Sequence, residues 1–155
     1  MIRALTPGER ALAEAAVGGA LRLEAVRILA APGLSRAFVP GRWFGRDWIV
    51  WPRRKLSADL SQAPLSRQAV FVHEMVHVLQ GQSGVPLAVG KLKAGDRPES
   101  YRYPTHAACR WSDLNIEQQA MVIEHRFRRA RGGTTPGSSG FYDRVRPDEL
   151  RHHAP

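Results

Sequence analysis

The sequence predicts a single α+β domain, built from a small N-terminal β-sheet and two longer helices. The chain has 155 residues and is 43% hydrophobic, which is enough for one core. Apolar residues recur at helical spacing over residues 66–82 and 113–130. A short aromatic and β-branched run at residues 48–51 precedes them and is typical of a strand. We expect residues 1–131 to form this domain.

A first helix is expected over residues 7–17. Thr6 suits the N-cap position, Pro7 takes the first helical position, and Glu9 can complete a capping box with Thr6. Two glycines follow directly after residue 17 and end the helix. Signals for both ends of this helix are therefore present in the sequence.

Two strands are expected after this helix. Residues 21–31 contain a short apolar run that fits either a helix or a strand, and we favour a strand at residues 26–29. Residues 48–51 (WIVW) give a stronger strand signal, because Gly45 precedes them and Pro52 follows them. These strands would form the small sheet of the domain.

The stretch HEMVH, from His73 to His77, lies in the first of the two longer helices. When residues 66–82 are placed at 100° steps, their apolar side chains share one arc of about 180°. The complementary arc holds His73, Glu74, His77 and Gln80. The helix is therefore amphipathic, with the motif on its less apolar side, and a glycine at position 84 suits its C-cap.

Residue type and spacing in this motif point to a metal ion. His73 and His77 are four residues apart, so their imidazoles lie one above the other and can reach a single ion. Zinc is the metal that best suits such a pair. Glu74 lies on the same side of the helix without lining up with the histidines, which suits a base acting on water at the metal.

The segment over residues 84–112 is rich in glycine, proline and charge and is expected to be mainly a connection, with a short strand at residues 101–103. The second long helix then starts with Asp113 or Asn115 as its N-cap and extends to about residue 130. Its core-facing stripe consists of Ile116, Ala120, Ile123 and Phe127.

A catalytic zinc site normally has three protein ligands, so one ligand must follow the HEMVH helix. No third histidine stands at the spacing HExxHxxGxxH, but the second long helix offers Glu117 and Glu124. These two are about 10 Å apart along the helix axis, so only one can be a ligand. We favour Glu117, because the small Ala120 lets the helices approach and the first turn favours a carboxylate. Glu124 is then either an acceptor behind the ligands or a surface residue.

The predictions for the C-terminal residues and for Cys109 rest on charge and composition. The chain has 23 Lys and Arg against 14 Asp and Glu, a net charge of +9. Residues 132–155 read as a flexible Gly/Ser-rich linker followed by a loosely held basic tail. We do not expect a nucleic-acid site, because these arginines are not interleaved with several aromatic residues. The lone Cys109 excludes an intrachain disulfide and is expected to be buried.

The N-terminal residues lack a long apolar segment after a basic start, and no run approaches the length of a membrane span. We therefore expect a protein made in the cytoplasm without a membrane span. Export by a route that does not read an N-terminal signal remains an open alternative.

Two motifs together resemble a known family. HEMVHVLQ, followed about forty residues later by NIEQQA, is similar to the gluzincin branch of zinc metallopeptidases. More narrowly, TPGERALAEAAVGGAL, VFVHEMVHVLQGQSG, YRY and LNIEQQAMVIEH resemble small bacterial Vgr-related proteins that are associated with type VI secretion spikes. The resemblance covers roughly residues 1–130 and implies a minimal zincin-like domain. It also implies that His73, His77 and Glu117 bind Zn²⁺ and that Glu74 is the catalytic base.

The resemblance further implies a polypeptide substrate and a secretion-spike protein as a partner. Zincins usually place an edge strand that aligns the substrate before the motif helix, where residues 48–51 lie. The chain departs from thermolysin-like enzymes because it lacks their second domain and a clear residue that stabilises the transition state. Candidate donors for that role are Tyr101, Tyr103, His106 and Tyr142, and spacing does not distinguish them.

Two functions of different classes follow from these observations. The first is a zinc metallopeptidase that acts as a type VI secretion effector. The second is a catalytically inactive zinc-fold adaptor that binds a spike or another partner protein.

Overall fold

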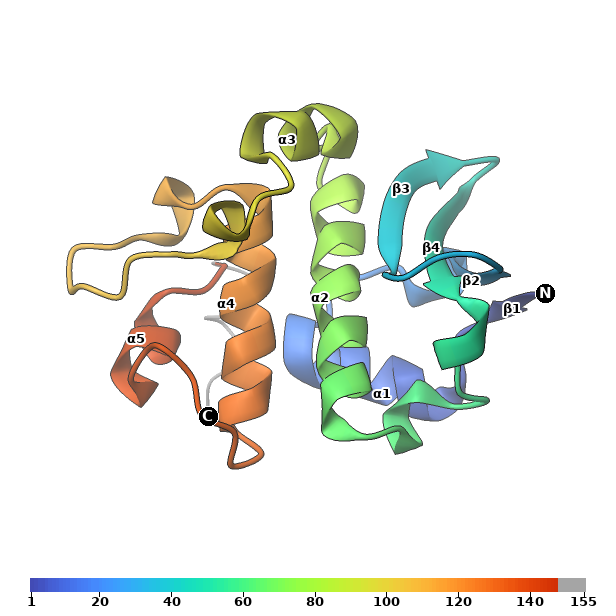
Figure 1. Ribbon diagram of the computed structural model, residues 1–155, viewed down its shortest axis with the longest axis horizontal. Helices are drawn as coiled ribbons and strands as arrows, with labels where there is room; N and C mark the ends of the chain where they lie inside the picture. The colour runs from blue at the N-terminus through green and yellow to red at the C-terminus, as the bar shows by residue number, and fades with distance from the viewer. Residues whose placement is uncertain (148–155) are drawn as a thin grey trace.

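The computed structural model describes residues 1–147, and within them five α-helices accompany one four-stranded sheet (Figure 1). The strands are β1 (Ile2–Ala4), β2 (Val26–Ala31), β3 (Phe38–Trp43) and β4 (Arg46–Pro52). The helices are α1 (Pro7–Val17), α2 (Leu65–Gln82), α3 (Leu87–Ala94), α4 (Ile116–Arg129) and α5 (Ser139–Arg144). The predicted α+β class is confirmed.

The sheet has the strand order β1-β2-β4-β3. Strand β2 runs parallel to β4, with Ile28 opposite Ile49, and both outer strands are antiparallel to their neighbours. The expectation that residues 48–51 form an edge strand is therefore wrong. Strand β4 is covered by β3, which forms a hairpin with it and occupies the edge. The sequence of β3, FVPGRW, contains proline and glycine, and both weaken a strand signal.

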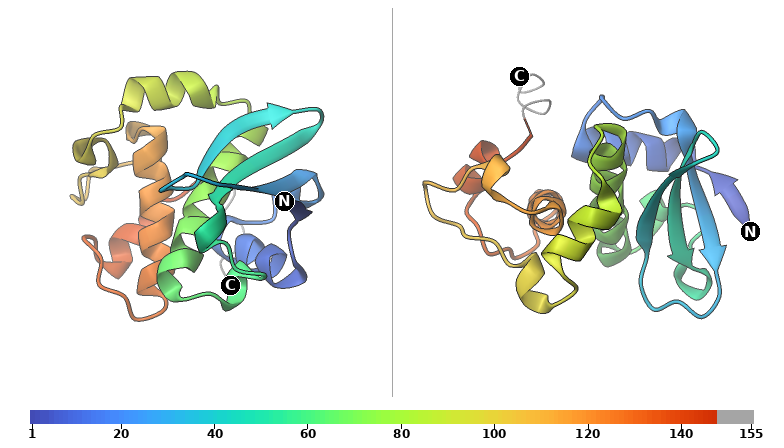
Figure 2. Two further views of the ribbon diagram at one scale, coloured as in Figure 1. Left: turned by 45° about the vertical axis from the view of Figure 1, so that its right-hand side comes forward. Right: turned by 90° about the horizontal axis from the view of Figure 1, so that it is seen from above.

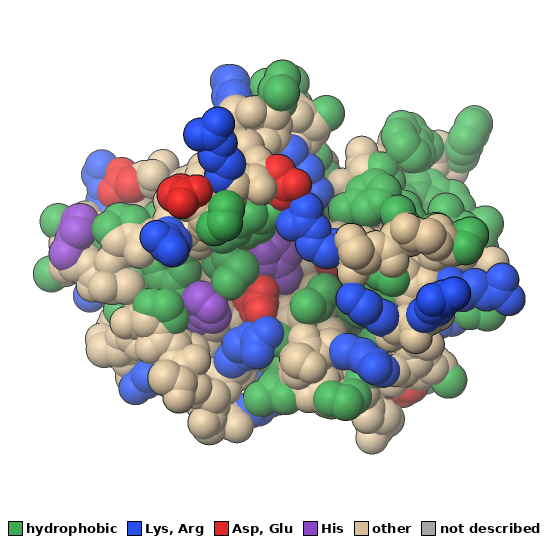
Figure 3. Space-filling view, in the orientation of Figure 1, with side chains coloured by type: hydrophobic (Ala, Val, Ile, Leu, Met, Phe, Trp, Pro, Cys, Tyr) green, Lys and Arg blue, Asp and Glu red, His purple; other side chains and the backbone are tan. Residues whose placement is uncertain are grey.

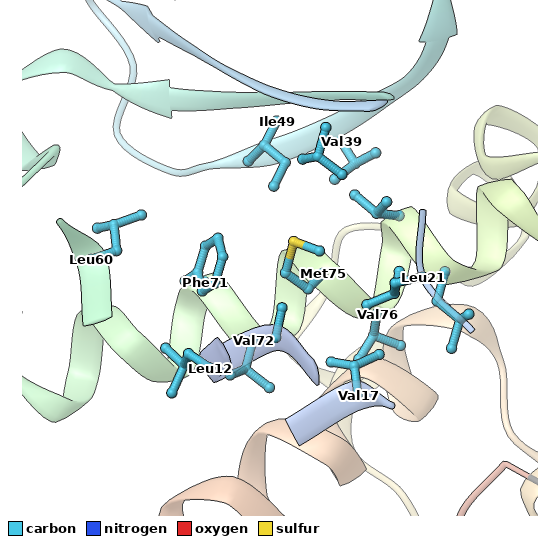
Figure 4. Close-up of a cluster of buried hydrophobic side chains, with 14 of the residues drawn as sticks. Leu12, Val17, Leu21, Val39, Ile49, Leu60, Phe71, Val72, Met75 and Val76 are labelled. Carbon is cyan, nitrogen blue, oxygen red and sulfur yellow. The ribbon is translucent and has the colours of Figure 1, made fainter. Parts of the chain in front are cut away.

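Helix α2 lies at the centre of the molecule, between the sheet and α4 (Figure 2). Phe71 and Met75 point from α2 toward Ile49 and Val39 of the sheet (Figure 4). On another side of α2, Val72 packs with the side chains of α1. The less apolar arc of the predicted helix is buried as well, because α4 covers it.

The first helix begins as predicted, with Thr6 as N-cap, a capping box with Glu9, and Pro7 at its start. Glu9 is fully buried and does more than cap the helix. Its carboxylate accepts two hydrogen bonds of 2.7 Å from the Arg3 guanidinium and one of 2.9 Å from the backbone N–H of Leu60. One carboxylate therefore joins β1, α1 and the segment before α2.

The segment over residues 84–112 differs from the expected connection. It contains α3, and the short strand expected at residues 101–103 is absent. Residues 98–101 form one turn of 3₁₀ helix, and residues 102–103 have no regular secondary structure. Gly90 lies in α3 against Ile116, and a Cβ atom at this position would be only 2.8 Å from Ile116 Cδ1. This glycine, which weakened the helix signal, is needed for the close approach of α3 and α4.

The tail is also packed more closely than expected. Phe141 and Tyr142 of α5 are buried, and they form a second small core with Val145, Cys109, Leu114 and Val122. The expectation of a loosely held tail is therefore wrong as far as Val145, whereas the buried position of Cys109 is confirmed. The domain division at residue 131 stays a prediction, and residues 148–155 of the expected tail lie outside the described residues.

Residues 1–147 include no helix with both the length and the apolar content needed to cross a membrane.

The buried carboxylate of Glu9 provides a test of this arrangement. Glu9→Ala should lower the free energy of unfolding by about 3 kcal/mol, because it leaves a partly buried guanidinium and a buried backbone N–H without an acceptor. Glu14→Ala, at an exposed position of the same helix, should change stability by less than about 0.5 kcal/mol. Urea denaturation followed by circular dichroism measures both variants. Equal stability of the two would contradict the assigned role of Glu9.

Candidate metal centre

Helix α2 presents His73 and His77 to α4. The two residues are one turn apart, their ring centroids are separated by 4.9 Å, and the rings are nearly perpendicular at 79°. Both side chains are buried, with 8% of His73 and 1% of His77 exposed. The i, i+4 spacing read from the sequence therefore becomes a pair of imidazoles under one neighbouring helix.

Helix α4 supplies Glu117 from its first turn. Asn115 is the N-cap and forms a capping box with Gln118, which sets the start of the helix. Glu117 Oε2 lies 3.3 Å from His73 Nε2 and 3.1 Å from His77 Nε2. The ligand atoms of these three residues all lie within 4.8 Å of one another, so the group could hold a metal ion.

The close approach of the two helices has a local cause. Ala120, one turn after Glu117, is fully buried at their contact. A small side chain at this position lets the α4 backbone come near α2, as the sequence predicted.

In each imidazole, the nitrogen that does not face Glu117 is Nδ1, and it donates a hydrogen bond. His73 Nδ1 donates to Glu124 Oε2 at 3.1 Å, and His77 Nδ1 donates to Gln80 Oε1 at 2.8 Å. These bonds direct both Nε2 atoms toward Glu117, an arrangement common behind metal-binding histidines. Glu124 therefore has the first of its two predicted roles, because it accepts a hydrogen bond from a candidate ligand, His73. Its other oxygen, Oε1, accepts a hydrogen bond of 2.9 Å from Arg128 Nε.

Sequence reasoning missed the contribution of Gln80. Its Nε2 donates to the backbone oxygen of Ile116 at 3.0 Å and to Gln119 Oε1 at 2.9 Å. These two bonds fix the orientation of the amide, so its oxygen must face His77. Its position three residues after His77 on the same arc was the signal that could have revealed this role.

Glu74 is buried beside the metal-ligand candidates, with 5% of its surface exposed. Its Oε2 atom is buried and has no hydrogen-bond partner among the described residues. A buried polar atom without a partner is rare in folded proteins and is often found at functional sites. Glu74 lines the cleft described below, and this oxygen has no partner within the described residues to hold it.

A cleft of about 640 Å³ opens onto Glu74 and the three metal-ligand candidates. Its walls include Phe38 and Trp51 on the side of the sheet and Tyr101 on the side of α4. Histidine side chains are visible in the hollow at the centre of the face shown in Figure 3. The site is therefore accessible despite the low exposure of its residues.

Only one of the four donor candidates from the sequence lines this cleft. The Tyr101 ring centroid lies 6.4 Å from that of His73. By contrast, Tyr103 is held by a 2.6 Å contact with His125 Nδ1 and a 2.8 Å contact with Tyr142. His106 is exposed and is not among the cleft residues. The structure thus separates Tyr101 from the other three candidates.

The carboxylates determine the charge of the site. Burial by itself lowers the pKa of His73, but hydrogen bonds to Glu117 and Glu124 outweigh it and raise this pKa to about 9. Burial tends to raise the pKa of both carboxyls, but their hydrogen bonds with His73 keep each pKa below its usual value. Without a metal ion, a proton on His73 neutralises part of this negative charge.

The chain is similar in sequence and in structure to a protein of type VI secretion. No family model matches it. In an alignment 137 positions long that covers 81% of the chain, it is 32% identical to the type VI secretion system spike protein VgrG2b of Pseudomonas aeruginosa. The chain spans about 13% of the length of that spike protein.

A solved structure of the effector domain of Pseudomonas aeruginosa VgrG2b is similar to the chain with a TM-score of 0.69 and 29% sequence identity. The match covers 83% of this chain and 75% of that one. The chain is homologous to the VgrG2b effector domain. The predicted resemblance to Vgr-related proteins is confirmed, whereas membership of the gluzincins, zinc as the ion and the roles of the site residues stay predictions.

The raised pKa of His73 gives metal binding a defined pH dependence. At pH 7, His73 of the metal-free chain carries a proton that a metal ion must displace, while Glu117 and Glu124 are already ionised. The apparent affinity for Zn²⁺ should therefore rise about tenfold per pH unit as the pH increases toward 9. Calorimetry in buffers of different ionisation enthalpy should detect release of about one proton from His73 per bound ion. Binding without proton release would contradict this description of the site.

Proposed function

We propose that the chain is a zinc metallopeptidase domain of a type VI secretion effector, with His73, His77 and Glu117 as ligands and Glu74 as general base. The observation that carries this proposal is the buried, unpaired Glu74 Oε2 beside the three converging ligand atoms. An adaptor that used the metal only for structure would have no need for a carboxylate with an unpaired oxygen beside the metal ligands.

The donor set fits zinc. Two imidazole nitrogens and one carboxylate oxygen form a common protein ligand set of catalytic zinc sites. Zinc held there would polarise a substrate carbonyl and lower the pKa of a water molecule. Glu74 would accept a proton from the attacking water at Oε2 and return it to the leaving amine nitrogen. Glu124 and Gln80 would keep both imidazoles oriented during this reaction.

The cleft suits a polypeptide substrate. One wall contains Ala37 and Phe38, where the chain enters the edge strand β3. An extended peptide could form main-chain hydrogen bonds along such an edge. Strand β3 therefore takes the substrate-aligning role that the sequence reading gave to residues 48–51.

The effector role rests on the homology. The VgrG2b relative is a spike protein, and the similar structure is its effector domain. A chain of this kind would associate with a secretion spike and leave the cell by a route that reads no signal peptide.

Glu74→Gln tests the catalytic proposal. The substitution keeps the size of the side chain but removes the base, so hydrolysis of unfolded casein should fall by about 10² to 10⁴. Zinc content should stay near one ion per chain, as measured by atomic emission. Glu117→Ala is the contrasting variant, and it should lose both zinc and activity.

If Glu74→Gln hydrolyses casein as fast as the unchanged chain, the peptidase proposal fails. The adaptor function would then stand if zinc is still bound.

Tyr101 is our candidate for stabilising the charge that develops on the substrate oxygen. Its burial and the nearby Glu117 raise its pKa to about 12, so the phenol stays protonated and able to donate. In the structure it donates to Asp96 Oδ1 at 3.1 Å. Tyr101→Phe should lower kcat by about 100-fold without loss of zinc. Tyr103→Phe is the matched control, because Tyr103 does not line the cleft. Equal loss of kcat in the two variants would exclude the assignment.

A further inference from the structure

Large apolar side chains are exposed at one end of the molecule. At the tip of the β3–β4 hairpin, Phe44 is 99% exposed and Trp43 is 56% exposed. On α3, Leu92 is 84% exposed and Val89 is 46% exposed. None of these four residues is among the metal-ligand candidates or lines the cleft. The proposed chemistry therefore gives no reason for their exposure.

The hairpin tip and α3 lie on the two sides of one groove. Both project at the same end of the molecule, where hydrophobic side chains are visible over each element (Figures 1 and 3). Between them lies a groove of about 230 Å³, lined by residues including Pro40, Trp43, Pro86 and Leu87. We call Arg42, Trp43, Phe44, Arg46, Val89, Lys91, Leu92 and Lys93 the apical face.

The backbone at Phe44 shows that folding does not explain this side chain. Phe44 and Gly45 form a two-residue turn between Trp43 and Arg46, with φ of 52° and 71°. Turns with two positive φ values favour Asn-Gly, whereas a bulky residue there is strained. Among residues 1–147, Phe44 is the only residue other than glycine with positive φ. The chain thus holds an exposed aromatic ring where local structure favours asparagine.

The charges of this face all have one sign. Four cations lie next to the apolar residues along the hairpin and along α3: Arg42, Arg46, Lys91 and Lys93. Residues 38–46 and 84–95 contain no carboxylate, and the neighbouring Asp47 is only 3% exposed and bound to Gln82 Nε2 at 2.7 Å. Asp96, directly after α3, is exposed but is paired with Arg36 at 2.8 Å. An occupant of this face must therefore accept apolar side chains and carry negative charge across a broad area.

We propose that the apical face docks on the surface of an anionic lipid bilayer. Phe44, Trp43 and Leu92 would enter the boundary between headgroups and acyl chains, as the apolar side of an interfacial helix does. The neighbouring cations would meet anionic headgroups. A bilayer suits projecting side chains on two separate elements, because it needs no matching pocket for each of them.

Docking would also place the cleft beside the membrane. Lys91 of α3 lies in the apical face and also lines the cleft. The face turned to the bilayer and the wall of the cleft therefore share helix α3. The proposal does not depend on catalysis, since it concerns residues outside the metal centre.

Cosedimentation of the full chain with vesicles tests the proposal. The chain should bind vesicles of phosphatidylglycerol and phosphatidylcholine at an ionic strength of about 0.1 M, and bind phosphatidylcholine alone far more weakly. Phe44→Asn with Leu92→Gln should reduce the partition coefficient at least about tenfold. Asn at position 44 suits the turn and Gln suits the helix, so this variant keeps its fold. Ile2→Ser, at a residue 58% exposed on the opposite edge of the sheet, should bind as the unchanged chain does.

A second pair of variants tests the role of the charges. Arg42→Ala with Arg46→Ala should reduce binding about 25-fold, whereas Arg53→Ala with Arg54→Ala, which removes two exposed cations elsewhere, should leave it unchanged. Equal loss in the two double variants would indicate diffuse attraction by net charge and overturn the proposal. Failure of the unchanged chain to bind anionic vesicles would also overturn it. So would a dimer in solution that Phe44→Asn with Leu92→Gln dissociates, if vesicles are not bound.

Discussion

Two imidazoles buried on α2 need buried acceptors, and this requirement determines how α4 packs against α2. Glu117 lies between the two Nε2 atoms, and Glu124 accepts from Nδ1 of His73. Without these carboxylates, the polar arc of α2 would lose the partners that offset its desolvation. The same contacts that stabilise the helix pair bring three ligand atoms within 4.8 Å of one another. Stability and site geometry therefore depend on one set of interactions.

The remaining elements extend this helix pair on both sides. The sheet packs against the apolar side of α2 and supplies one wall of the cleft through Phe38 and Trp51. Helix α3 lies against α4 through Gly90 and leads to Tyr101 on the opposite wall. The cleft thus forms where two layers meet the same central helix. The apical face lies beyond it, on elements that the metal centre does not use.

Prediction from sequence succeeded where the signal is local. The capping box at Thr6 and Glu9, the HEMVH helix and the N-cap at Asn115 all depend on residues within one or two turns. Strand β3 and helix α3 were missed because their proline and glycine residues weaken local propensity. Their stability comes from pairing with β4 and from close packing of Gly90 on Ile116, which are contacts between distant segments.

The sequence alone determined the α+β class, the two long helices, and the candidate ligands His73, His77 and Glu117 with Glu74 beside them. These follow from helical periodicity and from spacing within a single helix or a short list of carboxylates. Only the tertiary structure decided that Gln80 orients His77, that Glu124 is an acceptor for His73, and that Tyr101 alone of four candidates lines the cleft. These roles depend on which side chains meet across separate elements, and packing of the whole domain sets those distances.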